Sequence, residues 1–564
     1  MLSRPPSAAA AALSRLCILP LRDTTHRHVR ALHKICVPPT RKPLITPSDV
    51  RRRHPRPPGS RLLSSPPPSH PPRDDENGSV IPVWYTCGPT VYGPAHLGHA
   101  RTYVSLDMVR RTSGGRVAAH VTNVTDVDDK IIAAAAASGE RPLDLAARFE
   151  AEFWADMGRL HVLRPDAIVR VSEYMEEIVA YVAALEAGGL AYAVPGAPGD
   201  GSSVYFDVTA FEGSAAPGGR GLNQYGRLAP GVEAVAPSKF FEWEGGGDGD
   251  GDGGSAGSVQ KRDPRDFALW KGRPAPPGLD HADLPHGSIL DTPGSELCWT
   301  SPFGPGRPGW HVECSAMLDA AVDVLNDGGS GGRYKAVVHC GGIDLKFPHH
   351  ANEVAQSLGY RTVTTGAAPE EEWIDRWVHT GHLHISGRKM SKSLKNFVTV
   401  EEMFDVGHGG DDSDVADDFR LWCLGLSGSH TGPATYSPSR LREAAEVRGR
   451  IVRFLVAAQR HCDTAGEERW DAEDATVYRT ANDSGRACDA ALAGGGDATG
   501  FDGVAAYRHL MEMVAAGEGR LAVPAAAAGP VRALAQRVAG TLDALGFTGR
   551  TTRPRTPRST SSSV

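Results

Sequence analysis

Short apolar runs that end in turn residues mark the first ordered part of the chain. Ile81–Cys87 predicts a buried strand, and the turn Gly88-Pro89 follows it. A helix is predicted from His96 to Val109, and after the Gly114-Gly115 turn a second strand is predicted from Val117 to Asn123. This strand–helix–strand order indicates the start of a parallel α/β sheet, whose ligand crevice lies at the carboxyl ends of the strands.

The next part of the chain looks inserted into this pattern. Residues 136–261 contain two predicted helices, Leu143–Leu160 and Ala167–Ala187, and one predicted strand, Val204–Val208. Residues 245–257 are almost only Gly and Asp, which is typical of a solvated, flexible insertion.

The α/β pattern resumes after Lys261. Ala336–Cys340 and Val378–Ile385 are predicted strands, and Pro348–Leu358 is a predicted helix. Residues 438–545 are rich in Ala, Leu and Arg at helical spacing, which predicts a bundle of about four helices. The predicted fold class is therefore α/β: a Rossmann-like parallel-sheet domain with an inserted connective segment, followed by a C-terminal α-helical bundle.

Composition restricts the kind of protein this is. The chain has 564 residues, 40% of them hydrophobic, which is ordinary for a globular protein with several domains. Its net charge of −7 gives no global basic field, so nucleic-acid binding would need a local patch. No run approaches the roughly 18 apolar residues of a membrane span. The nine cysteines include no C-x-x-C pair, which favours a reducing compartment over a disulfide framework.

The N-terminal segment differs from the rest of the chain. Its first 73 residues carry twelve Arg and two Lys, against only Asp23 and Asp49 as acids, with many Ser and Pro. Residues 8–22 have the pattern of a short amphipathic helix. This composition predicts a mitochondrial or plastid transit peptide, and a disordered basic tail is the alternative.

Two short motifs carry the strongest chemical signal: His96-Leu97-Gly98-His99 and Lys389-Met390-Ser391-Lys392-Ser393. Two histidines one turn apart at a helix start can donate hydrogen bonds to phosphate oxygens, and the helix N-terminus adds its positive end. Gly98 allows the nucleotide to approach the backbone. Lys389 and Lys392, on a loop, can neutralise charge on departing pyrophosphate. Together the motifs predict an enzyme that activates a carboxylic acid with ATP.

Each motif has a structural alternative. Taken singly, His96 and His99 read as helix-capping or surface histidines, and the lysine motif reads as a solvated loop. The order and separation of the two motifs favour the ATP-handling interpretation.

These motifs and the residues around them resemble class I aminoacyl-tRNA synthetases, and most closely the cysteinyl-tRNA synthetase family. The matching segments are Tyr85–Tyr92, Thr125–Ile132, Asp266–Lys271, Gly306–Met317 and Gly342–Glu353. The resemblance is dense over residues 83–396 and thinner up to about residue 545.

The resemblance implies an organisation and an activity. Over the matching part of the chain, the domains would be a catalytic domain in two halves (80–135 and 262–385) around a connective insertion (136–261), the lysine-motif loop with a stem-contact region (386–438) and a helical anticodon-binding-like domain (439–548). Composition adds a transit peptide before them (1–79) and a disordered tail after them (549–564). The implied enzyme forms cysteinyl-adenylate from L-cysteine and ATP with Mg²⁺, and transfers cysteine to tRNA(Cys). A monomer is expected.

Four scattered residues form a candidate zinc site: Cys87, Cys314, His349 and Glu353. His349 and Glu353 are four residues apart and therefore share one helix face, and Cys87 closes the first strand. Two thiolates, one imidazole and one carboxylate make a plausible zinc ligand set. The spacing alone favours buried thiols and an ordinary helix pair, whereas the resemblance implies one Zn²⁺.

A zinc ion would explain how cysteine is selected. Thiolate binds zinc far better than hydroxyl does, whereas shape alone separates near-isosteric side chains poorly. The resemblance further implies that the amino acid's backbone groups contact Gly88, Thr125, Trp310 and Asp344. Trp310 could instead be a core residue, and Thr125 a helix cap.

The chain departs from the family pattern at several positions, and two alternative functions stay open. Cys340 stands where the family usually has Gly, which predicts an extra thiol near the metal site. One alternative function joins the cysteine adenylate to a small amine, although the stem-contact-like stretch Asp418–Ser437 and the helices after it argue against this. The other is an inactive RNA-binding paralogue, against which the intact motifs and ligand set argue.

Overall fold

A computed structural model describes residues 80–113, 119–214, 221–229, 261–274, 284–290, 297–327, 333–385, 387–389, 396–406, 411–465, 469–493, 500–523 and 526–552. The transit-peptide prediction, the Gly/Asp-rich stretch and most of the C-terminal tail lie outside these residues.

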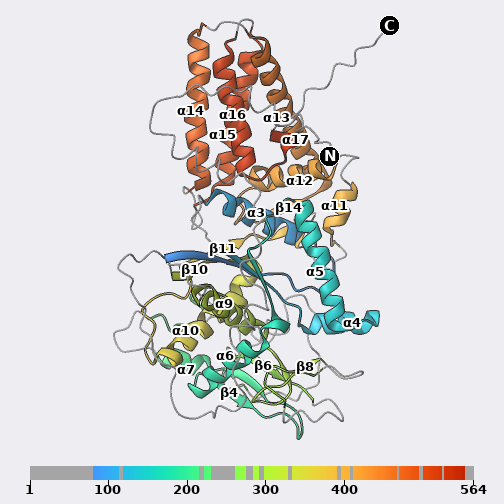
Figure 1. The fold of residues 1–564 in the computed structure, drawn as a ribbon, viewed down its shortest axis with the longest axis vertical. Coiled ribbons are helices and arrows are strands. Elements are labelled where there is room, and N and C mark those ends of the chain that lie inside the picture. The colour runs from blue at the N-terminus through green and yellow to red at the C-terminus, as the bar shows by residue number, and fades with distance from the viewer. Residues whose placement is uncertain are drawn as a thin grey trace, which may run out of the picture. The chain divides into compact units, whose positions relative to one another are not determined.

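A five-stranded parallel sheet forms the centre of the structure, with the strand order β11-β10-β1-β2-β3 (Figure 1). Its strands are β1 (Val80–Thr86), β2 (Ala119–Val124), β3 (Ala167–Arg170), β10 (Arg333–Gly342) and β11 (Arg376–Thr380). Crossover connections place β1 in the interior, which agrees with its continuous apolar sequence. The predicted Rossmann-like core is confirmed.

Helices cover both faces of this sheet. α3 (Leu97–Thr112) and α5 (Pro142–Arg159) pack in the hydrophobic cluster that contains Trp84 of β1. α6 (Met175–Ala187) and α9 (Trp310–Asp327) pack in a second cluster, which contains Tyr85. Because successive strand residues point to opposite faces, these neighbours in β1 belong to different layers. α10 (Ala351–Thr365) joins β10 to β11 and packs in the second cluster, and α4 (Asp129–Ser138) follows β2.

The prediction of one helix over Ala167–Ala187 is wrong. Residues 167–170 form β3 and pair with β2, so this part of the expected insertion belongs to the parallel sheet. The backbone N–H and hydroxyl of Ser172 donate to the Asp126 carboxylate at 3.0 and 2.5 Å, just after the strand. These bonds hold a short turn, η2 (Val171–Glu173), and the helix begins only at Met175.

The remainder of the insertion contributes to a second, antiparallel sheet with the order β4-β5-β6-β9-β8-β7. Its elements are β4 (Ala191–Val194), β5 (Ser203–Phe206), α7 (Val208–Gly213), β6 (Phe267–Gly272), β7 (Ile289–Leu290), β8 (Cys298–Trp299) and β9 (Gly306–Pro308). The predicted strand Val204–Val208 begins one residue earlier than expected, at Ser203, and ends at Phe206. It ends there because Asp207 caps α7 by accepting a hydrogen bond from the backbone of Ala210.

The predicted strand Val378–Ile385 is two strands in two sheets. β11 ends at Thr380, and β12 (Leu383–Ile385) joins a three-stranded sheet with β13 (Arg388–Lys389) and β14 (Ala434–Tyr436). The chain bends at Gly381, whose N–H donates to the carbonyl of His430 at 2.9 Å. A Cβ at Gly381 would lie 2.0 Å from the carbonyl oxygen of Gly432, so only glycine fits this crossing.

The predicted helix Pro348–Leu358 begins later than expected. After β10, residues 343–345 form the turn η4 (Ile343–Leu345), and residues 346–350 form η5 (Lys346–His350). Phe347 has an extended backbone conformation inside η5, and the regular helix α10 starts at Ala351.

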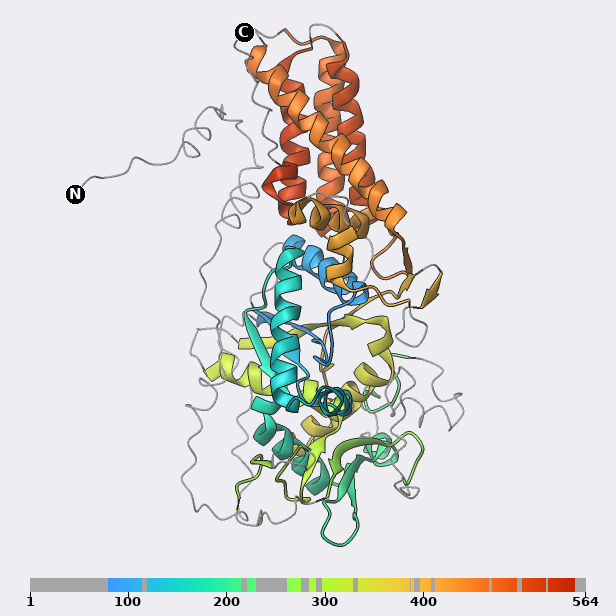
Figure 2. The same ribbon diagram turned by 90° about the vertical axis from the view of Figure 1, so that its right-hand side faces the viewer.

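The C-terminal part is helical, and the four long helices α13–α16 confirm the predicted bundle (Figure 2). Its elements are α11 (Val400–Val406), α12 (Asp412–Leu421), η6 (Trp422–Leu426), α13 (Pro438–Thr464), α14 (Ala472–Ala493), α15 (Gly503–Leu521), α16 (Ala528–Ala544) and α17 (Gly549–Thr552). Ser437 caps α13 by accepting a hydrogen bond from the backbone of Arg440, and Pro438 occupies the first helical turn.

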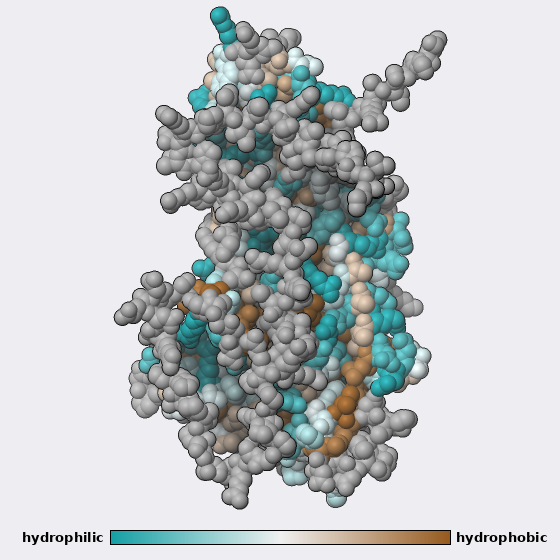
Figure 3. Space-filling view, in the orientation of Figure 1, coloured by the Kyte–Doolittle hydropathy of each residue, from teal (hydrophilic) through white to brown (hydrophobic). Residues whose placement is uncertain are grey.

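Large hydrophobic side chains are rarely exposed in the described residues. On the face in Figure 3, hydrophobic residues form a streak among many hydrophilic ones. The large hydrophobic side chains that are exposed among the described residues are Val80, Leu163, Leu284, Ile289, Trp470, Val504 and Val523. Among the described helices, none combines the length and apolar character that crossing a membrane requires.

Candidate active site

The carboxyl edge of the parallel sheet brings the predicted site residues together. Cys87 and Gly88 come directly after β1, Thr125 follows β2, and Asp344 follows β10. Three hydrogen bonds close this edge: Cys87 N–H donates to the Cys340 carbonyl at 2.9 Å, Thr125 N–H to Pro89 at 3.1 Å, and the Tyr103 hydroxyl to the Cys87 carbonyl at 2.9 Å. These residues therefore lie at the sheet edge where the strand order predicts ligand binding.

The four predicted metal ligands converge in the buried interior. Cys87 Sγ lies 3.7 Å from Cys314 Sγ, 3.5 Å from His349 Nε2 and 4.0 Å from Glu353 Oε1. Cys314 Sγ lies 3.5 Å from His349 Nε2, which in turn lies 3.0 Å from Glu353 Oε1. The elements that carry them are the end of β1, α9, η5 and α10.

These separations fit one tetrahedral ion. With Zn–S near 2.3 Å and Zn–N near 2.0 Å, the ligand atoms of a tetrahedral site lie about 3.4–3.8 Å apart. The sulfur–sulfur and sulfur–nitrogen separations of 3.7 and 3.5 Å agree with this, and the contacts of Glu353, at 3.0 and 4.0 Å, lie on either side of the range. The donor set and its geometry therefore suit a metal ion.

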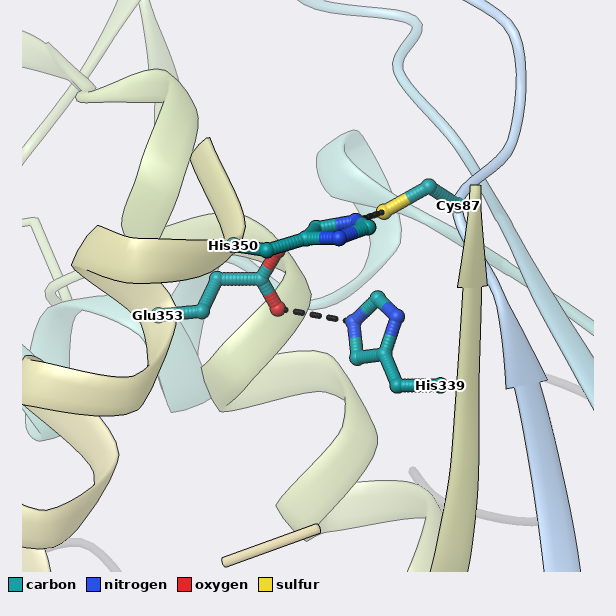
Figure 4. A group of neighbouring side chains, drawn as sticks. All are labelled: Cys87, His339, His350 and Glu353. Carbon is teal, nitrogen blue, oxygen red and sulfur yellow. Dashed lines mark hydrogen bonds and ion pairs between the residues drawn. The ribbon is translucent and has the colours of Figure 1, made fainter. Parts of the chain in front are cut away.

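A second group of possible ligands overlaps the first: Cys87, His339, His350 and Glu353 (Figure 4). Cys87 Sγ lies 3.4 Å from His350 Nε2, and Glu353 Oε2 lies 2.9 Å from His339 Nε2. His350 also contacts His379, with 2.8 Å between Nδ1 and Nε2. The groups share one thiol and one carboxylate, so together they form a single cluster.

Neighbouring charges control the protonation of this cluster. Burial opposes ionisation of Glu353, but His339 and His349 outweigh it and lower the pKa of the carboxyl to about 2. Burial likewise opposes the charged imidazole of His349, but Glu353 and Cys314 raise its pKa to about 10. Burial and Cys314 raise the pKa of Cys87 well above its usual value. A bound cation would displace the protons of Cys87 and His349, so its binding must weaken in acid.

Two neighbours orient His349. His311 Nδ1 lies 3.1 Å from His349 Nδ1, which leaves Nε2 of His349 directed at the two thiols. The ring of Trp310 stacks on that of His349, with centroids 4.3 Å apart and planes 19° apart. Burial lowers the pKa of His311 well below its usual value, so His311 is neutral and its Nδ1 can accept a hydrogen bond from the Nδ1–H of His349. The role of His311 was not foreseen from the sequence, where only its position beside Trp310 could have suggested it.

The four residues expected to hold the amino acid differ in their exposure and in their contacts. Gly88 touches the backbone of Asn123 so closely that a Cβ would lie 1.5 Å from the Asn123 carbonyl oxygen, which requires glycine. Thr125 is buried, and Trp310 is partly exposed beside the ligand cluster rather than in the core. Asp344 is exposed on η4 at the same sheet edge.

The first motif forms the start of α3. His96 is the cap residue: its Nδ1 accepts from the His99 N–H at 3.2 Å, and His99 Nδ1 accepts from the His96 N–H at 3.4 Å. The two rings stack with centroids 3.7 Å apart. The Nδ1 atoms of His96 and His99 therefore act as helix caps, as the structural alternative predicts. Capping by Nδ1 is compatible with phosphate binding by Nε2.

The second motif lies partly outside the described residues, which include Lys389 in β13 but not Met390, Ser391, Lys392 or Ser393. The chain that follows it returns to the first motif. Leu97 N–H donates to the Val398 carbonyl at 3.0 Å, and Val400 N–H donates to the Ala95 carbonyl at 3.0 Å. The fold therefore joins the start of α3 to the segment after the lysine motif.

Cys340 lies next to the metal site, as predicted, because its carbonyl accepts from the Cys87 N–H, but its thiol does not join the ligand cluster. It is fully buried in the hydrophobic cluster that contains Trp84, on the face of the sheet opposite Tyr85. Burial raises the pKa of its thiol well above the usual value. Cys340 belongs to neither group of candidate ligands, because residues that alternate along β10 face opposite sides.

Comparisons with known proteins agree with this geometry. Residues 76–409 match the family model described as tRNA synthetases class I (C) catalytic domain. A relative named cysteine–tRNA ligase, cytoplasmic, from Dictyostelium discoideum is 42% identical over 57% of this chain and 40% of its own length. Cysteine–tRNA ligase of Thermococcus onnurineus is 35% identical over 71% of this chain and 69% of its own.

Among solved structures, methionyl-tRNA synthetase of Mycobacterium tuberculosis in complex with methionyl-adenylate superposes with a TM-score of 0.54 at 15% identity, over 84% of this chain and 92% of that one. This likeness concerns the fold alone. The chain spans about half the length of several curated relatives, for example 53% of cysteine–tRNA ligase from Methanococcus maripaludis. The match over residues 76–409 covers more than half of the chain, which therefore belongs to the class I tRNA synthetases and carries their (C)-type catalytic domain.

Proposed function

We propose that this chain activates L-cysteine with ATP, forming cysteinyl-adenylate and pyrophosphate, and then transfers cysteine to tRNA(Cys). The observation that carries the proposal is the buried cluster of two thiols, an imidazole and a carboxylate at the carboxyl edge of a class I synthetase sheet. Relatives that carry the name cysteine–tRNA ligase support it.

Zn²⁺ is the proposed resident ion, and Cys87, Cys314, His349 and Glu353 are its proposed ligands. This group is favoured over the overlapping one because it offers two thiolates, which zinc prefers, and because His311 fixes the ring of His349. When bound, zinc supplies a site for the substrate's sulfur and so separates cysteine from serine. His339 is then a support for Glu353, through its bond to Oε2.

The remaining steps use groups of this chain for binding and charge stabilisation. His96, Gly98 and His99 present the N-terminus of α3 to the phosphates of Mg²⁺-bound ATP. Lys389 and Lys392, with the other residues of their motif, are proposed to neutralise charge on the departing pyrophosphate. Gly88, Thr125, Trp310 and Asp344 are proposed to hold the backbone groups of cysteine.

The cellular setting is part of the proposal. The Arg-rich N-terminal composition supports import into a mitochondrion or plastid. We propose that the imported protein acts as a monomer in organellar protein synthesis.

The direct test is cysteine-dependent ATP–pyrophosphate exchange, followed by charging of a tRNA(Cys) transcript. Both reactions are expected. Exchange without charging would favour the alternative in which the adenylate reacts with a small amine, and absence of exchange would contradict the proposal altogether.

A further inference from the structure

Asn123 is a buried amide on a face of β2 that is otherwise apolar. Val121, two residues earlier on the same face, is fully buried in the hydrophobic cluster around Tyr85, and Asn123 is only 2% exposed. A buried side-chain amide destabilises a fold unless its polar atoms are paired. The pairing of Asn123 therefore indicates what the residue is for.

Both ends of the amide contact residues proposed to hold the amino acid. The Gly88 N–H donates to Asn123 Oδ1 at 2.7 Å, and Asn123 Nδ2 donates to Thr125 Oγ1 at 3.4 Å. Thr125 Oγ1 in turn lies 3.4 Å from Oε2 of Glu313, which is also buried. One side chain thus joins the two loops that follow β1 and β2.

The chemistry of these groups fixes the direction of the hydrogen bonds. A backbone N–H can only donate, so the amide atom facing Gly88 must be the oxygen, and the nitrogen then faces Thr125. The Thr125 hydroxyl therefore accepts from Asn123, and its own hydrogen is directed to Oε2 of Glu313. Its remaining lone pair is an acceptor, and an acceptor suits an ammonium group but not a carboxylate.

We propose that Asn123 is a positioning residue for the amino-acid substrate: it orients the Thr125 hydroxyl as an acceptor for the substrate's α-ammonium group and engages the Gly88 N–H. This inference rests on the proposed function and adds a residue outside the predicted binding set. Asn123 acts through Thr125 and Gly88, and these two hydrogen bonds of its side chain involve neither a metal ligand nor a residue of the nucleotide motifs.

The test uses Asn123→Asp in the full-length protein. Aspartate keeps an oxygen for the Gly88 N–H but cannot donate to Thr125, so the hydroxyl loses its orientation. In ATP–pyrophosphate exchange the variant is expected to raise KM for cysteine about tenfold, the loss expected for one hydrogen bond to a charged group, and to leave KM for ATP and the metal content unchanged. Thr122→Val is the matched control, because Thr122 lies on the same strand and contacts His120 on the other face.

A double-variant cycle separates positioning from a structural effect. If Asn123 acts through the hydroxyl, Asn123→Asp adds no further increase in KM for cysteine once Thr125→Val is present. An equal increase in both backgrounds, or a parallel rise in KM for ATP, would overturn the inference. If Asn123→Asp does not fold, Asn123→Ser, which removes the amide without adding charge, is judged by the same criteria. Wild-type protein without cysteine-dependent exchange would instead refute the proposed function.

Discussion

The guanidinium Nη1 of Arg420 lies 2.7 Å from Oδ2 of Asp107, and both side chains are almost fully buried. Arg420, in α12, also donates to the carbonyls of Leu160 and Leu545, each at 2.9 Å. Asp107 lies in α3, the helix that begins with the first nucleotide motif. This ion pair therefore links that helix to the C-terminal helical part of the chain.

Breaking the pair from one side should destabilise the protein. Arg420→Met leaves the buried Asp107 carboxylate with Arg111, 2.8 Å away, as its remaining cation. Removing one partner of a buried pair costs up to about 3–5 kcal/mol of unfolding free energy, and Arg111 should hold the loss to the lower part of that range. Urea denaturation of the full chain measures this change. Arg486→Ala is the control, because Arg486 and Asp483 form an exposed pair whose loss should cost less than about 1 kcal/mol. Equal effects of the two substitutions would contradict the assigned role.

The same pair predicts a dependence of stability on pH. Burial opposes ionisation of Asp107, but Arg420 and Arg111 outweigh it and hold the pKa of the carboxyl below its usual value. Because the folded-state pKa is depressed, the stabilisation is present above the unfolded pKa of about 4 and is lost as the pH falls through the folded value. The stability difference between wild type and Asp107→Asn should therefore shrink below about pH 4. A difference that stays constant down to pH 2.5 would exclude this linkage.

His96 offers a way to separate capping from catalysis. Asparagine is an effective helix cap, so His96→Asn should keep α3 folded while removing the ring proposed to meet the phosphates. Loss of one preorganised donor commonly lowers kcat by about 10²–10³-fold. Exchange kinetics together with thermal unfolding test this, and a variant with normal stability and normal kcat would assign His96 to capping alone.

His311 is expected to tune metal affinity without binding the ion. Replacing a residue that orients a metal-bound histidine commonly weakens metal affinity by about 10–100-fold, and His311→Ala should do so here. Competition with a chromophoric chelator gives the affinity. Cys340→Ser is the control, since Cys340 lies on the other face of the sheet and should leave the affinity unchanged. If only Cys340→Ser lowered the metal affinity, the role in metal binding would belong to Cys340 and not to His311.

Regular patterns in the sequence predicted most of the elements, and the family resemblance supplied the four ligands, whereas tertiary contacts decided the rest. The spacing of His349 and Glu353 placed both on one face, and the apolar run ending at Cys87 predicted a central strand. β3 could not be foreseen, because its four residues continue into a helical pattern. It forms by pairing with β2, and the bonds from Ser172 to Asp126 hold the turn between β3 and α6. Asn123 and His311 gave no local signal, since their partners lie elsewhere in the chain.

Selection of cysteine by a bound zinc ion is tested most directly by comparing cysteine and serine as substrates while the metal content is measured. Wild-type protein is expected to contain one zinc per chain and to support exchange with cysteine but scarcely with serine. Cys314→Ser is expected to lose most of its zinc, most of its activity with cysteine and its discrimination against serine. Wild-type protein that lacks zinc and still prefers cysteine would contradict selection of the substrate by zinc. A Cys314→Ser variant that retains both zinc and full selectivity would contradict it as well.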